Sequence, residues 1–88
     1  MPLNTNPLDP IIISLIRKGG TSLKPITPLS LTPFMQEGKI CVKFDKLKIN
    51  VCANSRGDLI TEFANQIINM WRSGSNKKVL STIFQEED

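Results

Sequence analysis

The chain has 88 residues, enough for one small domain with a modest core, and 11 basic against 8 acidic side chains give it a net charge of +3. It contains no histidine and only two cysteines, too few ligands for an ordinary zinc site and no base for a cysteine nucleophile, so we expect no cofactor, no metal and no enzymatic activity. No apolar run reaches the length of about 18 residues that suggests a membrane helix, and the first residues lack the features of a signal peptide, so we expect a cytoplasmic or nuclear protein without a membrane span.

Residues 1–38 are predicted to form a proline-containing arm and connector. Residues 1–8 are polar and expected to be loose. Asp9-Pro10 and Gly19-Gly20 are typical of the start and the end of a short helix, whereas the three isoleucines at 11–13 favour a strand. We favour the helix.

The connector, residues 21–38, contains Pro25, Pro28 and Pro33, which favour an extended backbone in the residues before them. Its apolar residues indicate that it lies against the body of the domain. Together with the isoleucines of the arm they either pack in the core or leave an exposed patch that binds a partner. The candidate partner-binding residues are Ile11, Ile12, Ile13, Leu15, Ile16, Phe34 and Met35.

Residues 39–53 carry the clearest strand pattern. Apolar residues occupy even positions from 40 to 44 and odd positions from 47 to 51, and a hairpin that turns between the two halves brings both sets to one face. The turn has no glycine, so a four-residue loop is favoured over a tight turn. In that register Lys43 faces Asn50 and Cys41 faces Cys52.

The two cysteines have two interpretations. They form a disulfide across the hairpin if they are truly opposed, or they are free thiols if the protein resides in a reducing compartment. We expect free thiols.

Residues 55–74 predict an amphipathic helix, because at about 100° per residue the apolar side chains fall on one half of the helical wheel. Ser55 is a good N-cap, Asp58 suits the first turn, Arg72 suits the last turn, and Gly74 favours the left-handed end.

After a turn at residues 75–78, the segment 79–84 is predicted to be a final strand and residues 85–88 a solvated acidic tail. The predicted fold is therefore α+β: an arm or short helix, a β-hairpin, an amphipathic helix and a final strand. The strands would form a three-stranded sheet covered by one main helix. The whole chain is one domain with a ββαβ core at 39–84.

Residues 40–84 resemble the core of rhabdovirus matrix proteins. The matching pieces are VKFDKLKINVCANS, DLITEFANQIINMW with its tryptophan, the turn SGSNKK, and VLSTIF. The resemblance covers about half of the chain. It implies a shortened, matrix-like or accessory viral protein that contacts host or viral proteins in the host cell and performs no chemistry.

The function that we predict is a non-enzymatic interaction protein that works through protein–protein contacts, with a homodimer expected because the apolar surplus and a strand edge both favour association. The alternative is a small nucleic-acid-binding module that uses a basic hairpin. Its basic surface would consist of Lys39, Lys43, Lys46, Lys48, Arg56, Lys77 and Lys78.

Overall fold

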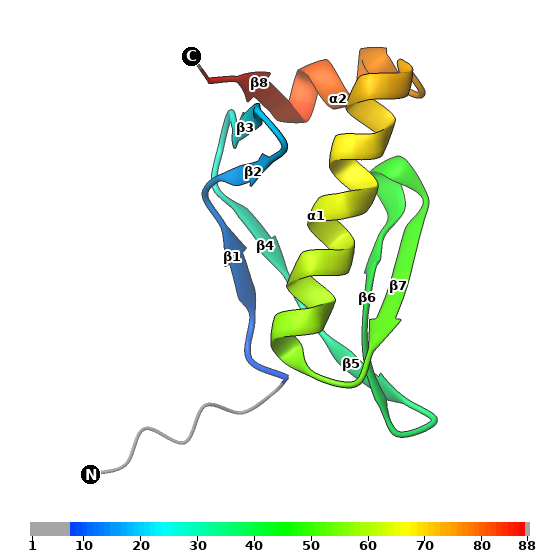
Figure 1. The fold of residues 1–88 in the computed structure, drawn as a ribbon. Coiled ribbons are helices and arrows are strands. Elements are labelled where there is room, and N and C mark those ends of the chain that lie inside the picture. The colour runs from blue at the N-terminus through cyan, green and yellow to red at the C-terminus, as the bar shows by residue number, and fades with distance from the viewer. Residues whose placement is uncertain (1–7, 88) are drawn as a thin grey trace, which may run out of the picture.

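A computed structural model describes residues 8–87. Within these residues the fold is mixed α+β, with eight strands in three small sheets and two helices (Figure 1). In chain order the elements are β1 Ile11–Ile13, β2 Ile16–Lys18, β3 Thr21–Pro25, β4 Leu29–Leu31, β5 Phe34–Gln36, β6 Lys39–Phe44, the 3-10 turn η1 Asp45–Leu47, β7 Ile49–Ala53, α1 Arg56–Ser73, α2 Lys77–Ile83 and β8 Phe84–Glu86. The predicted loose start of the chain, apart from residue 8, lies outside the described residues.

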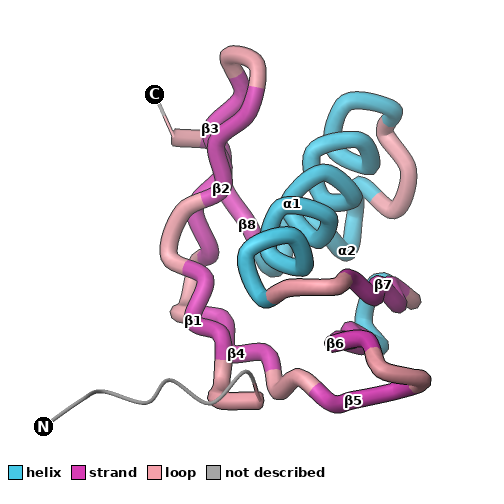
Figure 2. The backbone as a smooth tube through the Cα atoms, turned by 60° about the horizontal axis from the view of Figure 1, so that its bottom comes forward, coloured by secondary structure: helices cyan, strands magenta, loops and turns pink. Residues whose placement is uncertain are grey.

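The strands curve around α1 (Figure 2). They form three antiparallel groups, β1–β4, β2–β3–β8 and β5–β6–β7. Buried side chains from all three groups and both helices form one core cluster around α1. The fold is thus a helix held in a bent β layer.

Helix α1 confirms the predicted helix and both of its ends. The Oγ of Ser55 accepts a hydrogen bond from the backbone N–H of Asp58 at 3.1 Å, and Gly74 is left-handed with φ 79°. The buried residues on the apolar half of the helix are Leu59, Phe63, Ile67 and Ile68. The ring of Phe63 meets the ring of Phe44 edge-on, with 6.0 Å between the centroids.

The predicted hairpin is confirmed as β6 and β7, in the register with the wider loop. Cys41 pairs with Cys52 and Lys43 with Asn50, and the loop is η1, closed by Lys48 with φ 55°. The third strand of this sheet is β5, which pairs with β6. It precedes the hairpin in the chain, whereas the sequence pattern predicts the third strand at residues 79–84.

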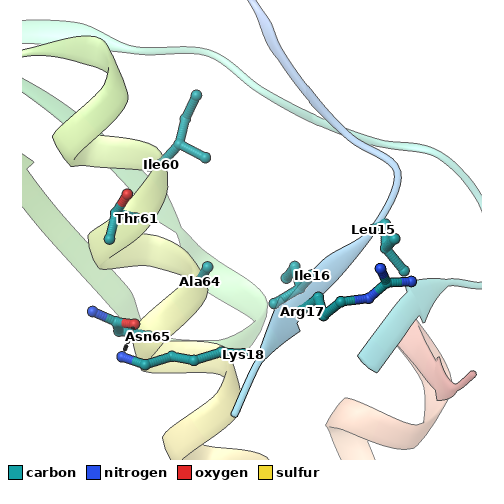
Figure 3. Close-up of a pocket in the computed structure, with 8 residues that line it drawn as sticks. All are labelled: Leu15, Ile16, Arg17, Lys18, Ile60, Thr61, Ala64 and Asn65. Carbon is teal, nitrogen blue, oxygen red and sulfur yellow. Dashed lines mark hydrogen bonds between the residues drawn. The ribbon is translucent and has the colours of Figure 1, made fainter. Parts of the chain in front are cut away.

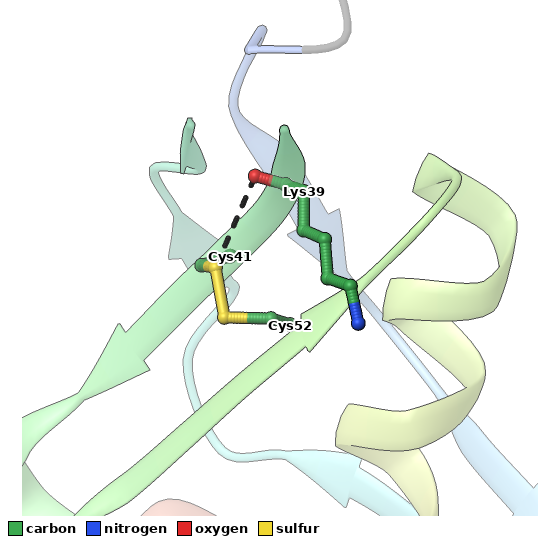
Figure 4. The surroundings of a disulfide bond; sticks show 3 residues. All are labelled: Lys39, Cys41 and Cys52. Atoms are coloured by element: carbon green, nitrogen blue, oxygen red, sulfur yellow. Dashed lines mark hydrogen bonds between the residues drawn. A yellow bond between two sulfur atoms is a disulfide. The ribbon is translucent and has the colours of Figure 1, made fainter. Parts of the chain in front are cut away.

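The prediction of free thiols is wrong, because Cys41 and Cys52 form a disulfide (Figure 4). Their Cα atoms lie 4.0 Å apart across the hairpin. The dashed line in Figure 4 joins the Cys41 sulfur to the Lys39 carbonyl oxygen at 4.0 Å, and because a bonded sulfur carries no proton this is a packing contact. The predicted register placed Cys41 opposite Cys52, and this pairing is confirmed.

Residues 9–18 are not a helix but contain β1 and β2. The isoleucines pack by strand alternation, with Ile11 and Ile13 buried and Ile12 exposed. Gly19 and Gly20, with φ 56° and 86°, form the two-residue turn between β2 and β3. Positive φ at both positions is the type I′ geometry that suits a hairpin and that glycine adopts without strain.

The predicted final strand is also corrected, since residues 77–83 form helix α2 and strand β8 begins at Phe84. Leu80 and Ile83, three residues apart, are buried on one side of α2, as is Phe84 just after it. Apolar residues occupy both odd and even positions of residues 79–84, so the alternation of apolar and polar residues could not distinguish a strand from a helix there. The predicted acidic tail is partly strand, because Gln85 and Glu86 pair with β3.

The predicted division into arm, core and tail therefore does not hold. The sheet β2–β3–β8 joins the start of the described chain to its end. Leu23 of β3 and Phe84 of β8 are both buried in the common core.

Candidate functional site

An open groove of about 350 Å³ lies between β2 and α1 (Figure 3). On the strand side it is lined by four consecutive residues, and on the helix side by residues one turn apart. The lining residues are Leu15, Ile16, Arg17, Lys18, Ile60, Thr61, Ala64 and Asn65. Successive strand residues point to opposite faces, so a run of four lining residues means that the groove follows the edge of β2 and not one of its faces.

The groove is apolar near Ile16 and basic along the strand. Lys18 reaches across to donate a hydrogen bond from Nζ to the Oδ1 of Asn65, whereas Arg17 points away from α1 and its Nε donates to the Oγ of Ser22 at 3.2 Å (Figure 3). The lining includes no Asp or Glu. The charge that the groove presents is therefore positive.

Arg72 of α1 forms hydrogen bonds with the β2–β3 turn at the end of this groove. Its Nη2 donates to the carbonyl oxygens of Lys18 at 3.1 Å and Gly19 at 2.8 Å, and to the Oγ1 of Thr21 at 3.3 Å. Hydrogen bonds from a charged donor are stronger than neutral ones. The sequence argument assigned Arg72 to the helix end alone and missed this contact with residues more than fifty positions earlier.

The predicted partner-binding residues divide into two groups. Three of them, Ile11, Ile13 and Ile16, are buried in the core, so their prediction as docking residues does not hold. The other four remain exposed: Ile12, Leu15, Phe34 and Met35.

Two of the exposed residues belong to β5, an edge strand in which all three residues are exposed. Phe34 is 37% exposed and Met35 is 51% exposed. Phe34 pairs with Cys41 in register, which places the ring on the same sheet face as the disulfide. The hairpin of β5 and β6 extends beyond the start of α1, so the helix does not cover this edge (Figure 1).

The seven predicted basic residues do not form one patch. Lys39 and Arg56 lie near the start of α1, where Arg56 donates to the backbone oxygens of Asp9 at 2.6 Å and Pro10 at 2.9 Å. Lys43 lies within β6, on the face away from α1. The remaining four, Lys46, Lys48, Lys77 and Lys78, lie at the opposite end, where α2 packs against η1 (Figure 1).

An aromatic residue accompanies the lysines of this end. The Nζ of Lys77 lies 3.5 Å from the centroid of the Trp71 ring, a cation–π contact. The two residues are six positions apart and lie on different helices, so their contact depends on the turn between α1 and α2.

Among residues 8–87, no group of three His, Cys, Asp or Glu side chains is placed to hold a metal ion. Neither helix of that region is long and apolar enough to cross a bilayer. Comparisons with family models, curated proteins and solved structures give no match for the chain.

Proposed function

We propose that this protein is a non-enzymatic interaction protein that contacts another protein chain through β5, with a second copy of itself as the partner. One observation carries the proposal: β5 is an exposed edge strand that presents two large apolar side chains, Phe34 and Met35. An uncovered edge offers unpaired backbone groups to another strand, and exposed apolar side chains add buried area when it pairs.

Two copies of β5 fit a two-fold arrangement. Antiparallel pairing of identical edges brings each strand opposite the other and closes the assembly at two chains. A matrix-like or accessory protein of the kind that the resemblance implies would use the same surface for a host or viral protein.

Light scattering over a range of protein concentrations tests this proposal. We expect a mass that rises to twice that of the chain, and we expect Met35→Lys to return the protein to a monomer, because the added charge would be buried in the interface. Ile26→Lys is the matched control, since Ile26 is also 51% exposed but lies after β3, away from β5. A wild-type monomer at every concentration, or equal effects of both variants, would contradict β5 as a dimer interface.

A second candidate function is nucleic-acid binding at the end formed by η1 and α2. It is supported by the four lysines gathered there and by Lys77 on the ring of Trp71. Lysines that neutralise phosphates release counterions, so such binding weakens steeply with salt.

Anisotropy of a labelled single-stranded oligonucleotide tests the second candidate. We expect the double variant Lys77→Glu with Lys78→Glu to weaken low-salt binding by about tenfold or more, because reversed charges repel phosphates. A single Lys39→Glu, at the other end of β6, should change it far less. Absence of binding at low salt, or a loss as large in Lys39→Glu, would reject this function.

A further inference from the structure

The backbone of β2 is available for pairing on the side away from β3. Among residues 8–87, β2 pairs with β3 alone. The two-residue glycine turn makes Lys18 and Thr21 the closing pair, so the alternation of an antiparallel ladder directs the backbone groups of Arg17 away from β3. Ser22, which lies opposite Arg17, also directs its backbone groups away from the β2–β3 pair. Its carbonyl oxygen accepts a hydrogen bond from the backbone N–H of Glu87 at 2.9 Å.

The groove beside α1 borders this free edge. It is lined by the unbroken run from Leu15 to Lys18, and the alternate residues differ in character. Ile16 is buried toward α1, where Ile60 and Ala64 add partly buried apolar surface, whereas Arg17 is exposed on the other face of the strand. A strand added here would therefore meet Ile16, the apolar surface of α1 and the stem of Lys18 on one face, and the guanidinium of Arg17 on the other.

We propose that the groove binds an extended peptide segment of another protein, in which apolar and acidic side chains alternate, by adding it as a strand to the edge of β2. Neighbouring strands place opposed side chains on the same face. The peptide residue opposite Arg17 faces the guanidinium and is acidic. Of its two neighbours, the one opposite Ile16 is apolar, and the one opposite Lys18 lies over the methylene stem of that side chain, whose Nζ donates a hydrogen bond to Asn65. The groove lining has two cations and no carboxylate, which favours an acidic segment over a basic one.

The edge of β2 is held against α1 by the side chain of Arg72. Arg72 holds the turn that follows β2 through the carbonyl oxygens of Lys18 and Gly19. A strand edge fixed on a helix loses little freedom when a peptide binds, and main-chain hydrogen bonds then contribute affinity while the alternate side chains select the sequence.

Fluorescence anisotropy with a short labelled peptide of alternating valine and glutamate tests the proposal. We expect saturable binding of this peptide and binding about tenfold weaker when lysine replaces glutamate, because the sign of the charge beside Arg17 is reversed. A third peptide keeps the glutamates but carries N-methyl groups on the alternate backbone amides that would face β2. It is expected not to bind, since N-methylation removes the donors of the ladder.

Protein variants locate the peptide. Arg17→Glu is expected to weaken binding of the glutamate peptide by about tenfold or more. Lys24→Glu makes the same charge change on an exposed residue of β3 outside the groove and should leave the affinity within about twofold. Thermal melting shows whether both variants fold. The comparison of the three peptides uses the wild-type protein and so does not depend on the folding of the variants.

No saturable binding of the glutamate peptide, equal binding of the lysine or N-methylated peptide, or an equal loss in Lys24→Glu would overturn the proposal. The result is separate from the role of β5. Met35→Lys, which removes the β5 contact, is expected to bind the glutamate peptide as the wild type does.

Discussion

Phe63→Ala is expected to lower the free energy of unfolding by about 3–5 kcal/mol, the usual range for emptying an aromatic core site. Phe63 lies on the buried face of α1 with 1% of its surface exposed and meets Phe44 of β6 edge-on. Its removal leaves a cavity between the helix and the hairpin, where both sides are held by other contacts and cannot close over it. A domain of this size has a total stability of the same order, so the variant is expected to be largely unfolded at body temperature.

Trp71→Ala is the comparison that makes this test specific. Trp71 lies on the same apolar half of α1, but it is only partly buried and one face of its ring is covered by Lys77. The structure therefore predicts a smaller loss for Trp71→Ala than for Phe63→Ala. Urea unfolding of both variants gives the two values, and a Phe63→Ala midpoint equal to that of the wild type would contradict the core described here.

The elements that the sequence predicted correctly are those specified by local signals that agree. In α1 the period, the Ser55 cap and the Gly74 end all indicate the same helix, and the structure has the same boundaries to within a residue. In the hairpin the change of parity between Phe44 and Leu47 is explained by a turn, and the absence of glycine there selected the correct register.

The elements that were missed depend on contacts distant in sequence. Asp9-Pro10 and Gly19-Gly20 suit the ends of a helix, but in the structure residues 11–13 pair with β4 and residues 16–18 pair with β3. A Gly-Gly pair between two short runs, here residues 16–18 and 21–23, is itself a hairpin signal that the sequence contains. At the other end, residues 77–83 become helical because Leu80 and Ile83 then share one buried side, which alternation could not show.

The groove could not be predicted, because its two sides come from residues 15–18 and 60–65. Its position follows from β2 being a strand and from the hydrogen bonds of Arg72 to the β2–β3 turn. Both facts require the tertiary fold. The candidate residues on β5 were identified by their apolar character, while their exposure follows from β5 being an edge strand of its sheet.

Replacing both cysteines by alanine is expected to lower the free energy of unfolding by roughly 3 kcal/mol, the value that loop closure gives for a short loop. The two residues are 11 positions apart, and the bond restricts the unfolded chain between them. Cys41 is also buried, so its truncation removes packing on the sheet face that carries Phe34. The loss applies only while the bond is formed, so reductant should destabilise the wild-type protein and leave the double variant unchanged.

Alkylation followed by mass spectrometry reports the bond directly. We expect no adduct on the native protein without reductant and two adducts after reduction and unfolding, since residues 8–87 include both cysteines and neither is free. The matched control for stability is Lys43→Ala with Asn50→Ala, the pair two positions along the same face of the hairpin, which removes cross-strand side chains without a covalent link. That pair is expected to cost about 1 kcal/mol or less. Two adducts on the unreduced protein, or equal losses for both double variants, would show that the hairpin is held by its ladder and core contacts and not by the disulfide.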